Sequence, residues 1–535
     1  MAAVEAPEPD EGAEAAKRPS LVFVGFMGSG KTAAANAARA AGLEAIEADE
    51  LLEGELGMPI ATFFGKRGEE EFRSLEDAEV GQLLENADGG VISLGGGAVC
   101  SERVRRALGR HIVVWLQVSA EEAWRRVEGS DRPLAQDRGR FDTLHAEREP
   151  IYAKLADAVL PSGDEGMVGR ALPALLALLE LPHGTRMAWG LSESGEYPVY
   201  VGPGLLDAGW WPLDGRRFCV TDTNVAALYA DAVGPLAGTV QVEPGERAKT
   251  LAEAERVLRE LTRLGMSRSD HLVALGGGVV GDLAGFCAAT YQRGVDVVHV
   301  PTTLVAQVDS AYGGKTGVDL PEAKNYVGAY HLPSAVLADT GTLVTLPREE
   351  LAAGFVEVLK TALIAGGWLW ERVRVLEDLD PAGLDDVIFA CARTKLEVVA
   401  ADERDAGRRA VLNLGHTVGH AIEAASGYER YRHGEAVGLG LLAALRLSGA
   451  DALREEVGAL LARQGLPTSL DPQVDMDAVL GAAERDKKRT ADGVGFVLLE
   501  RPGEPRIDQR VDSDAVRAAI AELRKDAAVT GGTGQ

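Results

Sequence analysis

Gly25-Phe-Met-Gly28-Ser-Gly30-Lys31-Thr32 follows the short apolar run 21–24 and precedes an alanine-rich segment. The octapeptide matches G-x-x-x-x-G-K-[ST] at every fixed position. In such a loop, consecutive backbone N–H groups curl around an anion at the positive end of the following helix. Lys31 would reach the β- and γ-phosphates, and Thr32 would bind Mg²⁺. The stretch therefore predicts a strand, a phosphate-binding loop and a helix, which together begin an α/β domain.

The rest of the first third of the chain continues this pattern. From residue 19 to residue 181, apolar runs alternate with longer segments rich in Ala, Glu and Arg. Such alternation is typical of a parallel sheet flanked by helices. Pro182-His-Gly-Thr breaks the last helical pattern, so we expect a linker over 182–194. The Ala/Glu/Pro tract 1–18 is expected to be a disordered tail.

The remainder of the chain predicts two further domains. Short β-branched runs over 195–346 each lead into a turn or helix, which indicates a second α/β nucleotide-binding domain. Segments rich in Ala, Leu, Glu and Arg dominate 347–525 and predict a mostly helical domain, with a strand or hairpin near 493–499. Residues 526–535 are expected to be a second disordered tail.

Composition restricts the classes of partner. The formal net charge of -27 repels polyanions, so we expect no nucleic-acid partner, although a local cluster of Lys and Arg can still bind a small phosphorylated substrate. No apolar run approaches the length of a spanning helix, and the chain start lacks the features of a secretory signal, so we expect no membrane partner. The 4 cysteines are widely spaced, which is typical of a reducing cytoplasm.

Over residues 19–181 the chain resembles shikimate kinase. The motifs that carry the resemblance are Glu47-Ala-Asp49, Gly68-Glu-Glu-Glu-Phe-Arg73-Ser-Leu-Glu76, Ser93-Leu-Gly95-Gly96-Gly97-Ala98, Arg132-Pro-Leu and Arg148-Glu-Pro-Ile-Tyr152. Taken singly, each is ambiguous, since Asp49 could cap a helix and Arg73 could be a solvated helix charge. Their joint order favours the kinase interpretation.

The resemblance implies a role for each motif. Asp49 would hold substrate hydroxyls, and Arg73 and Arg148 would grip the substrate carboxylate, because a planar guanidinium can bond both carboxylate oxygens. The glycine triplet lets the backbone approach the substrate ring. The implied catalytic residues are Lys31, Asp49 and Arg132, and the implied ATP-binding residues are Gly28, Ser29, Gly30, Lys31, Thr32 and Arg132.

The family usually carries Asp-x-Asp where this chain has Glu47-Ala-Asp49. The longer first side chain can shift the geometry of Mg²⁺. A nucleotide-binding module without transfer activity is therefore the alternative for this part of the chain.

From about residue 195 to residue 520 the chain resembles 3-dehydroquinate synthase. The motifs are Pro244-Gly-Glu246-Arg-Ala-Lys249-Thr, Gly276-Gly277-Gly278-Val-Val-Gly-Asp282, Arg293-Gly, Pro301-Thr302-Thr303, Asp309-Ser-Ala-Tyr-Gly-Gly-Lys315-Thr-Gly, Lys324-Asn325, Glu357-Val-Leu-Lys360, Arg409-Ala-Val-Leu-Asn413-Leu-Gly-His416-Thr-Val-Gly-His420, His433-Gly-Glu and Asp486-Lys487-Lys488.

Glu357, His416 and His433 are a carboxylate and two imidazoles, which suit a catalytic Zn²⁺ or Co²⁺ with open coordination positions. His416 and His420 are four residues apart and share a helix face, so spacing alone allows both as ligands. Satisfied core histidines are an equal alternative from the residues alone. Only the resemblance assigns His420 to substrate chemistry and the other three to the metal.

A glycine triplet after an apolar strand lets a dinucleotide pyrophosphate approach the backbone, but it is not the usual G-x-G-x-x-G arrangement and is weak evidence alone. The resemblance supplies NAD as the cofactor. The implied NAD-binding residues are Asp222, Asn224, Glu246, Lys249, Gly276, Gly277, Gly278, Asp282, Thr302, Thr303 and Thr345.

A small sugar acid that carries phosphate and carboxylate requires several cationic side chains, and the motifs contain such a set. The resemblance implies substrate contacts for Arg293, Asp309, Lys315, Lys324, Asn325, Lys395, Arg409, Asn413, His420, Lys487 and Lys488. It implies catalytic roles for Lys315, Lys360, Lys395, Arg409, Asn413 and His420.

The two resemblances together imply a bifunctional enzyme of the shikimate pathway. One half would phosphorylate shikimate with ATP and Mg²⁺. The other would convert 3-deoxy-D-arabino-heptulosonate 7-phosphate to 3-dehydroquinate and phosphate without net redox change, as a homodimer through this half. A related sugar-phosphate cyclase or a polyol dehydrogenase remains the alternative for the second half.

Overall fold

The structure is a computed structural model that describes residues 17–130, 133–164, 166–488 and 495–525, with side chains not described for 484–488 and 525. The chain divides into two compact units, Met1–Glu180 (unit 1) and Leu181–Gln535 (unit 2). None of the helices in the described part of the chain has the length and apolarity needed to span a bilayer.

Unit 1 is a parallel α/β fold. Its strands lie in the order β2 (Ala45–Glu47), β3 (Val91–Ser93), β1 (Leu21–Val24), β4 (Ile112–Leu116) and β5 (Ala158–Leu160), and each neighbouring pair is parallel. All four residues of β1 are buried, as expected for a central strand covered on both faces. The helices are α1 (Lys31–Ala40), α2 (Ala48–Leu56), α3 (Ile60–Arg67), α4 (Glu69–Asn86), α5 (Glu102–Leu108), α6 (Ala120–Val127), α7 (Arg138–Leu155) and α8 (Met167–Ala177).

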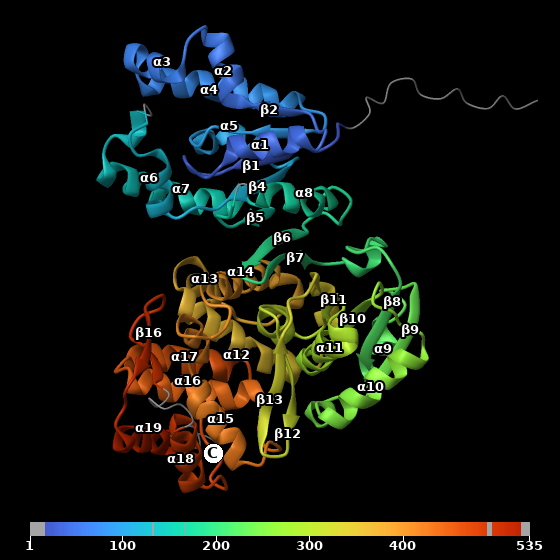
Figure 1. The fold of residues 1–535 in the computed structure, drawn as a ribbon. Helices are drawn as coiled ribbons and strands as arrows, with labels where there is room; N and C mark the ends of the chain where they lie inside the picture. Colours follow the sequence, from blue (N-terminus) through green and yellow to red (C-terminus); the bar gives the residue numbers. More distant parts are fainter. Residues whose placement is uncertain (1–16, 131–132, 165, 489–494, 526–535) are drawn as a thin grey trace, which may run out of the picture. The chain divides into compact units, whose positions relative to one another are not determined.

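Helix α1 begins directly at the predicted phosphate-binding loop. Its N-cap residue Gly30 has φ +95° and no side-chain cap, so the first backbone N–H groups of the helix stay available to an anion. The helix buries Ala34, Ala35 and Ala38, whose small side chains allow close packing. Helices α2, α3 and α4 lie together in Figure 1, in contact with one another.

The sheet strands of unit 2 are parallel except for their first pair. The strands lie in the order β6 (Arg186–Ser192), β7 (Gly195–Gly202), β14 (Ala335–Asp339), β11 (Val297–Pro301), β10 (His271–Gly276), β8 (Arg217–Asp222) and β9 (Leu236–Val242). β6 and β7 are antiparallel, whereas β7 and every later pair are parallel. Helices α9 (Thr223–Tyr229), α10 (Leu251–Arg263) and α11 (Gly278–Thr290) connect these strands, and β12 (Lys315–Leu320) and β13 (Ala323–Tyr330) form a separate hairpin.

The expected linker over 182–194 is wrong, because β6 occupies most of it. β6 is half of a hairpin with β7, and its residues Met187 and Trp189 are buried. The Pro182 break and the polar turn after Ser192 flank a strand rather than a flexible connection. At the chain start, the backbone N–H of Arg18 donates to Asp88 at 2.8 Å, so Arg18, although within the expected tail 1–18, is part of the fold. Residues 1–16 and the expected tail 526–535 lie outside the described residues.

The predicted helical region is confirmed. It consists of α12 (Arg348–Ala365), α13 (Gly367–Val373), α14 (Asp385–Ala401), α15 (His416–Ala425), α16 (His433–Leu447), α17 (Asp451–Arg463), α18 (Met476–Lys488) and α19 (Ser513–Lys525). The expected strand near 493–499 is β15 (Phe496–Leu499), which pairs with β16 (Pro505–Gln509). Helix α14 packs against β6 and β7, so this region and the sheet form one compact unit (Figure 1).

Close contact between α15 and α16 depends on glycine. A Cβ added at Gly440 would overlap the backbone carbonyl oxygen of Gly415, which cannot move away as a flexible side chain can. We therefore expect Gly440→Ala to lower the free energy of unfolding by about 2–3 kcal/mol. The nearest atom to a Cβ at Gly458 in α17 lies 3.8 Å away. Gly458→Ala should instead add about 0.5–1 kcal/mol through helix propensity. Urea unfolding followed by tryptophan fluorescence measures both, and equal midpoints for the two variants would contradict this account.

Candidate active sites

The phosphate-binding loop of unit 1 has its lysine in place. Lys31 Nζ donates to the carbonyl oxygens of Gly25 at 2.9 Å and Phe26 at 3.0 Å, so the ammonium group lies across the loop. Gly28 has φ +80°, a conformation that side-chain-bearing residues rarely adopt. Thr32 is exposed in the first turn of α1, where its hydroxyl is open to a ligand. Arg132, the predicted lid residue, lies outside the described residues.

The predicted substrate residues of unit 1 meet at the glycine triplet. A Cβ at Gly95 would lie 2.7 Å from Asp49 Oδ1, and a Cβ at Gly97 would overlap the Arg73 guanidinium. Arg148 Nη1 donates to the Gly96 carbonyl at 3.3 Å. The triplet is therefore glycine because a carboxylate and two guanidinium groups approach the backbone there.

Two buried carboxylates of unit 1 are not among the predicted site residues. Glu76 is 3% exposed and pairs with Arg73, and burial raises the pKa of Glu76 above its usual range. Its place in α4, three residues after Arg73, is the signal that could have found it. Glu47 is 8% exposed and accepts from Arg39 Nη1 at 2.9 Å, so an arginine holds the side chain that departs from the family pattern.

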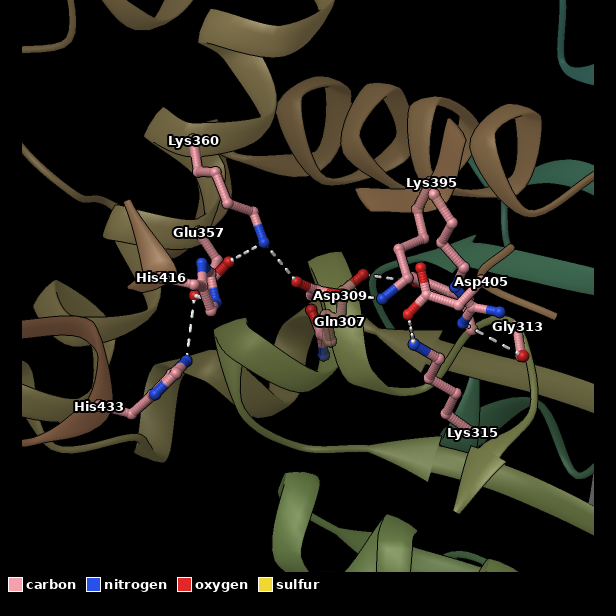
Figure 2. Close-up of polar contacts among 12 residues, drawn as sticks. Gln307, Asp309, Gly313, Lys315, Glu357, Lys360, Lys395, Asp405, His416 and His433 are labelled. Atoms are coloured by element: carbon pink, nitrogen blue, oxygen red, sulfur yellow. Dashed lines mark hydrogen bonds and ion pairs between the residues drawn. The ribbon is translucent and has the colours of Figure 1, made fainter. Parts of the chain in front are cut away.

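In unit 2, the predicted metal ligands lie on three helices and come together. Glu357 is on α12, while His416 and His433 are the first residues of α15 and α16. Glu357 Oε1 lies 3.6 Å from His416 Nε2 and 3.3 Å from His433 Nε2 (Figure 2). The first residues of two helices thus place both imidazoles against one buried carboxylate.

This donor set fits a divalent metal ion. Tetrahedral ligands at about 2.0–2.1 Å from a zinc ion lie roughly 3.3 Å from one another, close to both distances. Glu357 Oε1 faces both imidazoles, whereas Oε2 lies 2.5 Å from Lys360 Nζ, so Oε1 is the oxygen with capacity for a cation. Burial lowers the pKa of His416 well below its usual range, which keeps the neutral form that binds metals.

His420 belongs to a second group of potential ligand atoms, together with Glu423 and His433. The spacing left open whether His420 joins Glu357, and the structure groups it with Glu423 instead. Glu423 is 3% exposed and was missed by the sequence analysis. Although burial favours the neutral acid, contacts with His433 and Lys324 lower the pKa of Glu423 to about 2.

A chain of ion pairs leads from the metal ligands to the predicted substrate lysines (Figure 2). Lys360 Nζ lies 2.5 Å from Glu357 Oε2 and 2.9 Å from Asp309 Oδ2, and Lys395 pairs with the other oxygen of Asp309. Lys315 Nζ lies 2.5 Å from Asp405, an acidic residue that the sequence analysis did not single out. These ion pairs thus fix the positions of the three lysines.

One cavity of about 1120 Å³ contains most of the predicted cofactor and substrate residues. The predicted NAD residues that line it are Asp222, Asn224, Glu246, Lys249, Gly277, Gly278, Asp282, Thr302, Thr303 and Thr345. Gly276 is the last residue of β10, immediately before this lining. Helix α11 begins at Gly278, so its N-terminus offers N–H groups and a positive dipole end to a pyrophosphate.

The cavity also contains much of the predicted substrate set, namely Asp309, Lys315, Lys324, Asn325, Lys395, Arg409 and His420, beside Glu357 and His433. Two predicted contacts are not among its lining residues. Arg293 is exposed in a turn with φ 72° after α11, and Asn413 is exposed at the end of a short 3-10 helix. The structure of one chain therefore does not bring these two residues to the site. Lys487 and Lys488 lie at the end of α18, and their side chains are outside the described ones.

Fold and site together define two classes of enzyme, a P-loop phosphotransferase in unit 1 and a dinucleotide- and metal-dependent enzyme in unit 2. Family models for shikimate kinase, for the N-terminal part of 3-dehydroquinate synthase and for its C-terminal part match residues 27–170, 239–353 and 354–489. The chain belongs to the 3-dehydroquinate synthase family, and its first unit is a shikimate kinase domain.

Curated relatives carry the same name over unit 2. The 3-dehydroquinate synthase of Symbiobacterium thermophilum is 45% identical over 358 residues, which are 62% of this chain and 100% of the relative. That of Halorhodospira halophila is 43% identical, over 63% of this chain and 99% of the relative. The match thus spans the full length of a synthase and leaves unit 1 as an addition.

Solved structures of related enzymes are more distant. A 2-deoxy-scyllo-inosose synthase complexed with carbaglucose-6-phosphate, NAD⁺ and Co²⁺ is 26% identical with a TM-score of 0.56, covering 63% of this chain and 99% of that one. A 2-epi-5-epi-valiolone synthase from Streptomyces hygroscopicus with NAD⁺ and Zn²⁺ is 28% identical with a TM-score of 0.56, covering 62% and 98%. Identity is thus higher to 3-dehydroquinate synthases than to these cyclases, which supports the synthase assignment over the alternatives.

Proposed function

We propose that the chain catalyses two reactions of the shikimate pathway at separate sites. Unit 1 phosphorylates shikimate to shikimate 3-phosphate with ATP and Mg²⁺, and unit 2 converts 3-deoxy-D-arabino-heptulosonate 7-phosphate to 3-dehydroquinate and phosphate with NAD and Zn²⁺ or Co²⁺. One observation carries the second assignment. The Glu357–His433 pair, 3.3 Å apart, and the start of α11 line one cavity with the substrate lysines.

In unit 1, the residues around the loop divide the work of phosphoryl transfer. Lys31 neutralises charge on the transferring phosphoryl group, the main strategy of this chemistry. Asp49 holds the substrate hydroxyl, and Arg73 and Arg148 bind the carboxylate. The pairing of Arg73 with buried Glu76 supports this role, because it fixes the guanidinium plane before substrate arrives.

In unit 2, the bound cofactors supply reversible hydride transfer and Lewis acidity toward substrate oxygens. The chain's own residues bind and orient the substrate. Lys315, Lys395 and Arg409 provide positive charge for its phosphate and carboxylate. Asp309 pairs with Lys360 and Lys395, and Lys360 also pairs with Glu357, so these ion pairs fix the positions of Lys395 and Glu357. His420 faces the same cavity and is placed to move a proton.

Product assays on the purified chain test the two activities. Incubation with the heptulosonate phosphate should release phosphate and form 3-dehydroquinate in equal amounts without accumulating NADH. Net NADH formation from a polyol without phosphate release would instead identify a dehydrogenase.

In the ATP assay, ADP should form only with shikimate, and Asp49→Asn should lose this activity while still binding ATP. A pure nucleotide-binding module would form no ADP in either case.

Lys395 predicts a pH dependence of substrate binding. Burial lowers the pKa of Lys395 to about 7, and the neighbouring Arg409 cation adds to this effect, whereas the ion pair with Asp309 acts in the opposite direction. The cation is present below this pKa and is lost as pH rises through it, so KM for the anionic substrate should rise several-fold between about pH 6 and pH 8. Arginine stays protonated in this range. Lys395→Arg should therefore flatten the KM profile, while titration of the substrate phosphate itself affects both enzymes equally. Parallel profiles would contradict the assignment.

The assembly state and the cell compartment are also proposals. A homodimer through unit 2 is supported by the exposed aromatic side chains Tyr326 and Tyr330 on β13, which are 67% and 40% exposed. Light scattering of the purified chain tests it. The cytoplasm is supported by free cysteines, three of which, Cys219, Cys287 and Cys391, are buried.

A further inference from the structure

Glu423 is a buried carboxylate that the reactions proposed above do not use. It lies on α15 and is 3% exposed, with each oxygen facing a different partner. Glu423 Oε2 lies 3.5 Å from His433 Nδ1, and Glu423 Oε1 lies 3.4 Å from Lys324 Nζ. A buried carboxylate is costly unless cations or hydrogen-bond donors compensate it, so these two contacts stabilise it.

The first contact acts on a metal ligand. His433 turns Nε2 toward Glu357, at 3.3 Å, and Nδ1 toward Glu423. A carboxylate beside Nδ1 favours the tautomer with the proton there, which leaves the lone pair of Nε2 for the metal. It also restricts rotation of the ring. Glu423 thus determines which ring nitrogen of His433 carries the proton and how the ring is oriented.

The second contact acts on the cofactor part of the cavity. Lys324 Nζ, besides Glu423, lies 3.9 Å from Glu246 Oε1, and Glu246 lies 3.8 Å from Lys249 Nζ. Lys249 is 2.6 Å from Asp282. Glu246, Lys249 and Asp282 all line the region assigned to NAD. Lys324 therefore connects Glu423 to the charged groups around the dinucleotide.

We infer that Glu423 is a positioning residue that couples the metal site to the cofactor site, so that either ligand raises the affinity for the other. The inference rests on the ligand assignments of the proposed function. A metal ion on His433 Nε2 fixes the ring, which fixes Glu423, and Glu423 then holds Lys324 in one place for the dinucleotide. Because coupling between two binding equilibria is reciprocal, NAD must strengthen metal binding by the same factor.

Binding measurements on the full chain test the coupling without any assay of turnover. The Kd for Zn²⁺ is measured by titrating metal-free protein with Zn²⁺ in competition with a chromophoric chelator, once with NAD present and once without it. The Kd for NAD is measured by calorimetry, once with Zn²⁺ present and once without it. In wild type, Zn²⁺ should lower the Kd for NAD about 5-fold or more. Glu423→Gln should raise the Kd for Zn²⁺ roughly 10- to 100-fold, the usual effect of losing a carboxylate behind a ligand histidine. In Glu423→Gln, the affinity for Zn²⁺ should no longer depend on NAD, and the affinity for NAD should no longer depend on Zn²⁺.

Three further variants make the result specific. Glu423→Asp keeps the charge and should recover part of the Zn²⁺ affinity. If Glu423→Gln does not fold, Glu423→Asp can be measured in its place. Lys324→Met leaves the His433 contact intact, so it should keep Zn²⁺ affinity but lose the coupling. Glu429→Gln changes a carboxylate that is 77% exposed and pairs only with exposed Arg247 in the described structure, and it should behave as wild type.

Several results would overturn the inference. If Zn²⁺ and NAD bound independently in wild type, there would be no coupling between the two sites. If Glu423→Gln bound Zn²⁺ and NAD with wild-type affinities, Glu423 would have no part in the coupling. Two bound metal ions per chain would make Glu423 a ligand of a second ion with His420 and His433, whose ligand atoms lie within 4.8 Å of one another. Failure of wild type to bind either ligand would refute the cofactor assignment itself, and is distinguishable from loss of coupling alone.

Discussion

His416→Ala is expected to abolish the formation of 3-dehydroquinate, with a fall of at least roughly 10³-fold in kcat/KM, and to leave the phosphorylation of shikimate unchanged. The expected loss is large because the proposed site has three protein ligands among the described residues. Removal of His416 leaves Glu357 Oε1 with one imidazole, His433, at 3.3 Å. Two remaining ligands bind zinc weakly, and a metal that polarises substrate oxygens supplies several kcal/mol of transition-state stabilisation.

The measurement compares phosphate release from the heptulosonate phosphate with the zinc content of the same preparation. Chelator treatment of wild type should reproduce the defect, and added Zn²⁺ should restore wild type but not His416→Ala. His183→Ala is the matched control, because His183 is an exposed histidine in the same unit. Since the kinase reaction requires only Mg²⁺ with ATP, its rate reports on unit 1 in each sample. A zinc-free variant that still cyclises substrate would contradict the metal assignment.

How far the sequence predicted these sites depends on how local each one is. The phosphate-binding loop was predictable from eight contiguous residues, because its chemistry comes from its own backbone and from the helix that Lys31 begins. The metal ligands lie on three helices, so no spacing rule joins them. For His416 and His420, helical spacing allowed a pairing, whereas the structure places Glu423 with His420.

The residues that the sequence analysis missed share a physical feature. Glu76, Asp405 and Glu423 are acidic partners of predicted cationic or ligand residues, namely Arg73, Lys315 and His433 with Lys324. In a sequence, an acidic residue that neutralises a buried cation looks the same as one that faces water. Only the fold shows that these carboxylates lie beside a site.

The strand β6 was missed because the residues in and around it are typical of turns, whereas the contacts that make it a strand come from distant parts of the fold. Pro182 and Gly184 precede the strand, and Gly190 lies within it. These residues usually mark turns. The strand forms nevertheless because Met187 and Trp189 are buried and every residue of β6 has a partner on β7. Pairing and burial at long range decided the structure of this segment.

Lys31→Met should abolish the phosphorylation of shikimate, lowering kcat by at least about 10³-fold, while the formation of 3-dehydroquinate continues at the wild-type rate. The substituted side chain keeps an unbranched apolar stem but loses the ammonium group. That group donates to the carbonyls of Gly25 and Phe26 at 2.9 and 3.0 Å, so it lies across the proposed phosphate-binding loop. Phosphoryl transfer relies on charge neutralisation and positioning, so no other part of the loop can replace a lysine.

ADP formation with and without shikimate measures this effect, and binding of a fluorescent ATP analogue separates lost affinity from lost transfer. Lys66→Met, at an exposed position of α3, makes the same chemical change away from the loop and should retain full activity. Methionine cannot donate to the two loop carbonyls, so a small loss of stability is expected, which thermal unfolding records separately. If Lys31→Met kept the wild-type rate, the loop would not be the phosphoryl-transfer site. If it lost both activities together, the two sites would not be independent, and the proposal that each unit works alone would have to be abandoned.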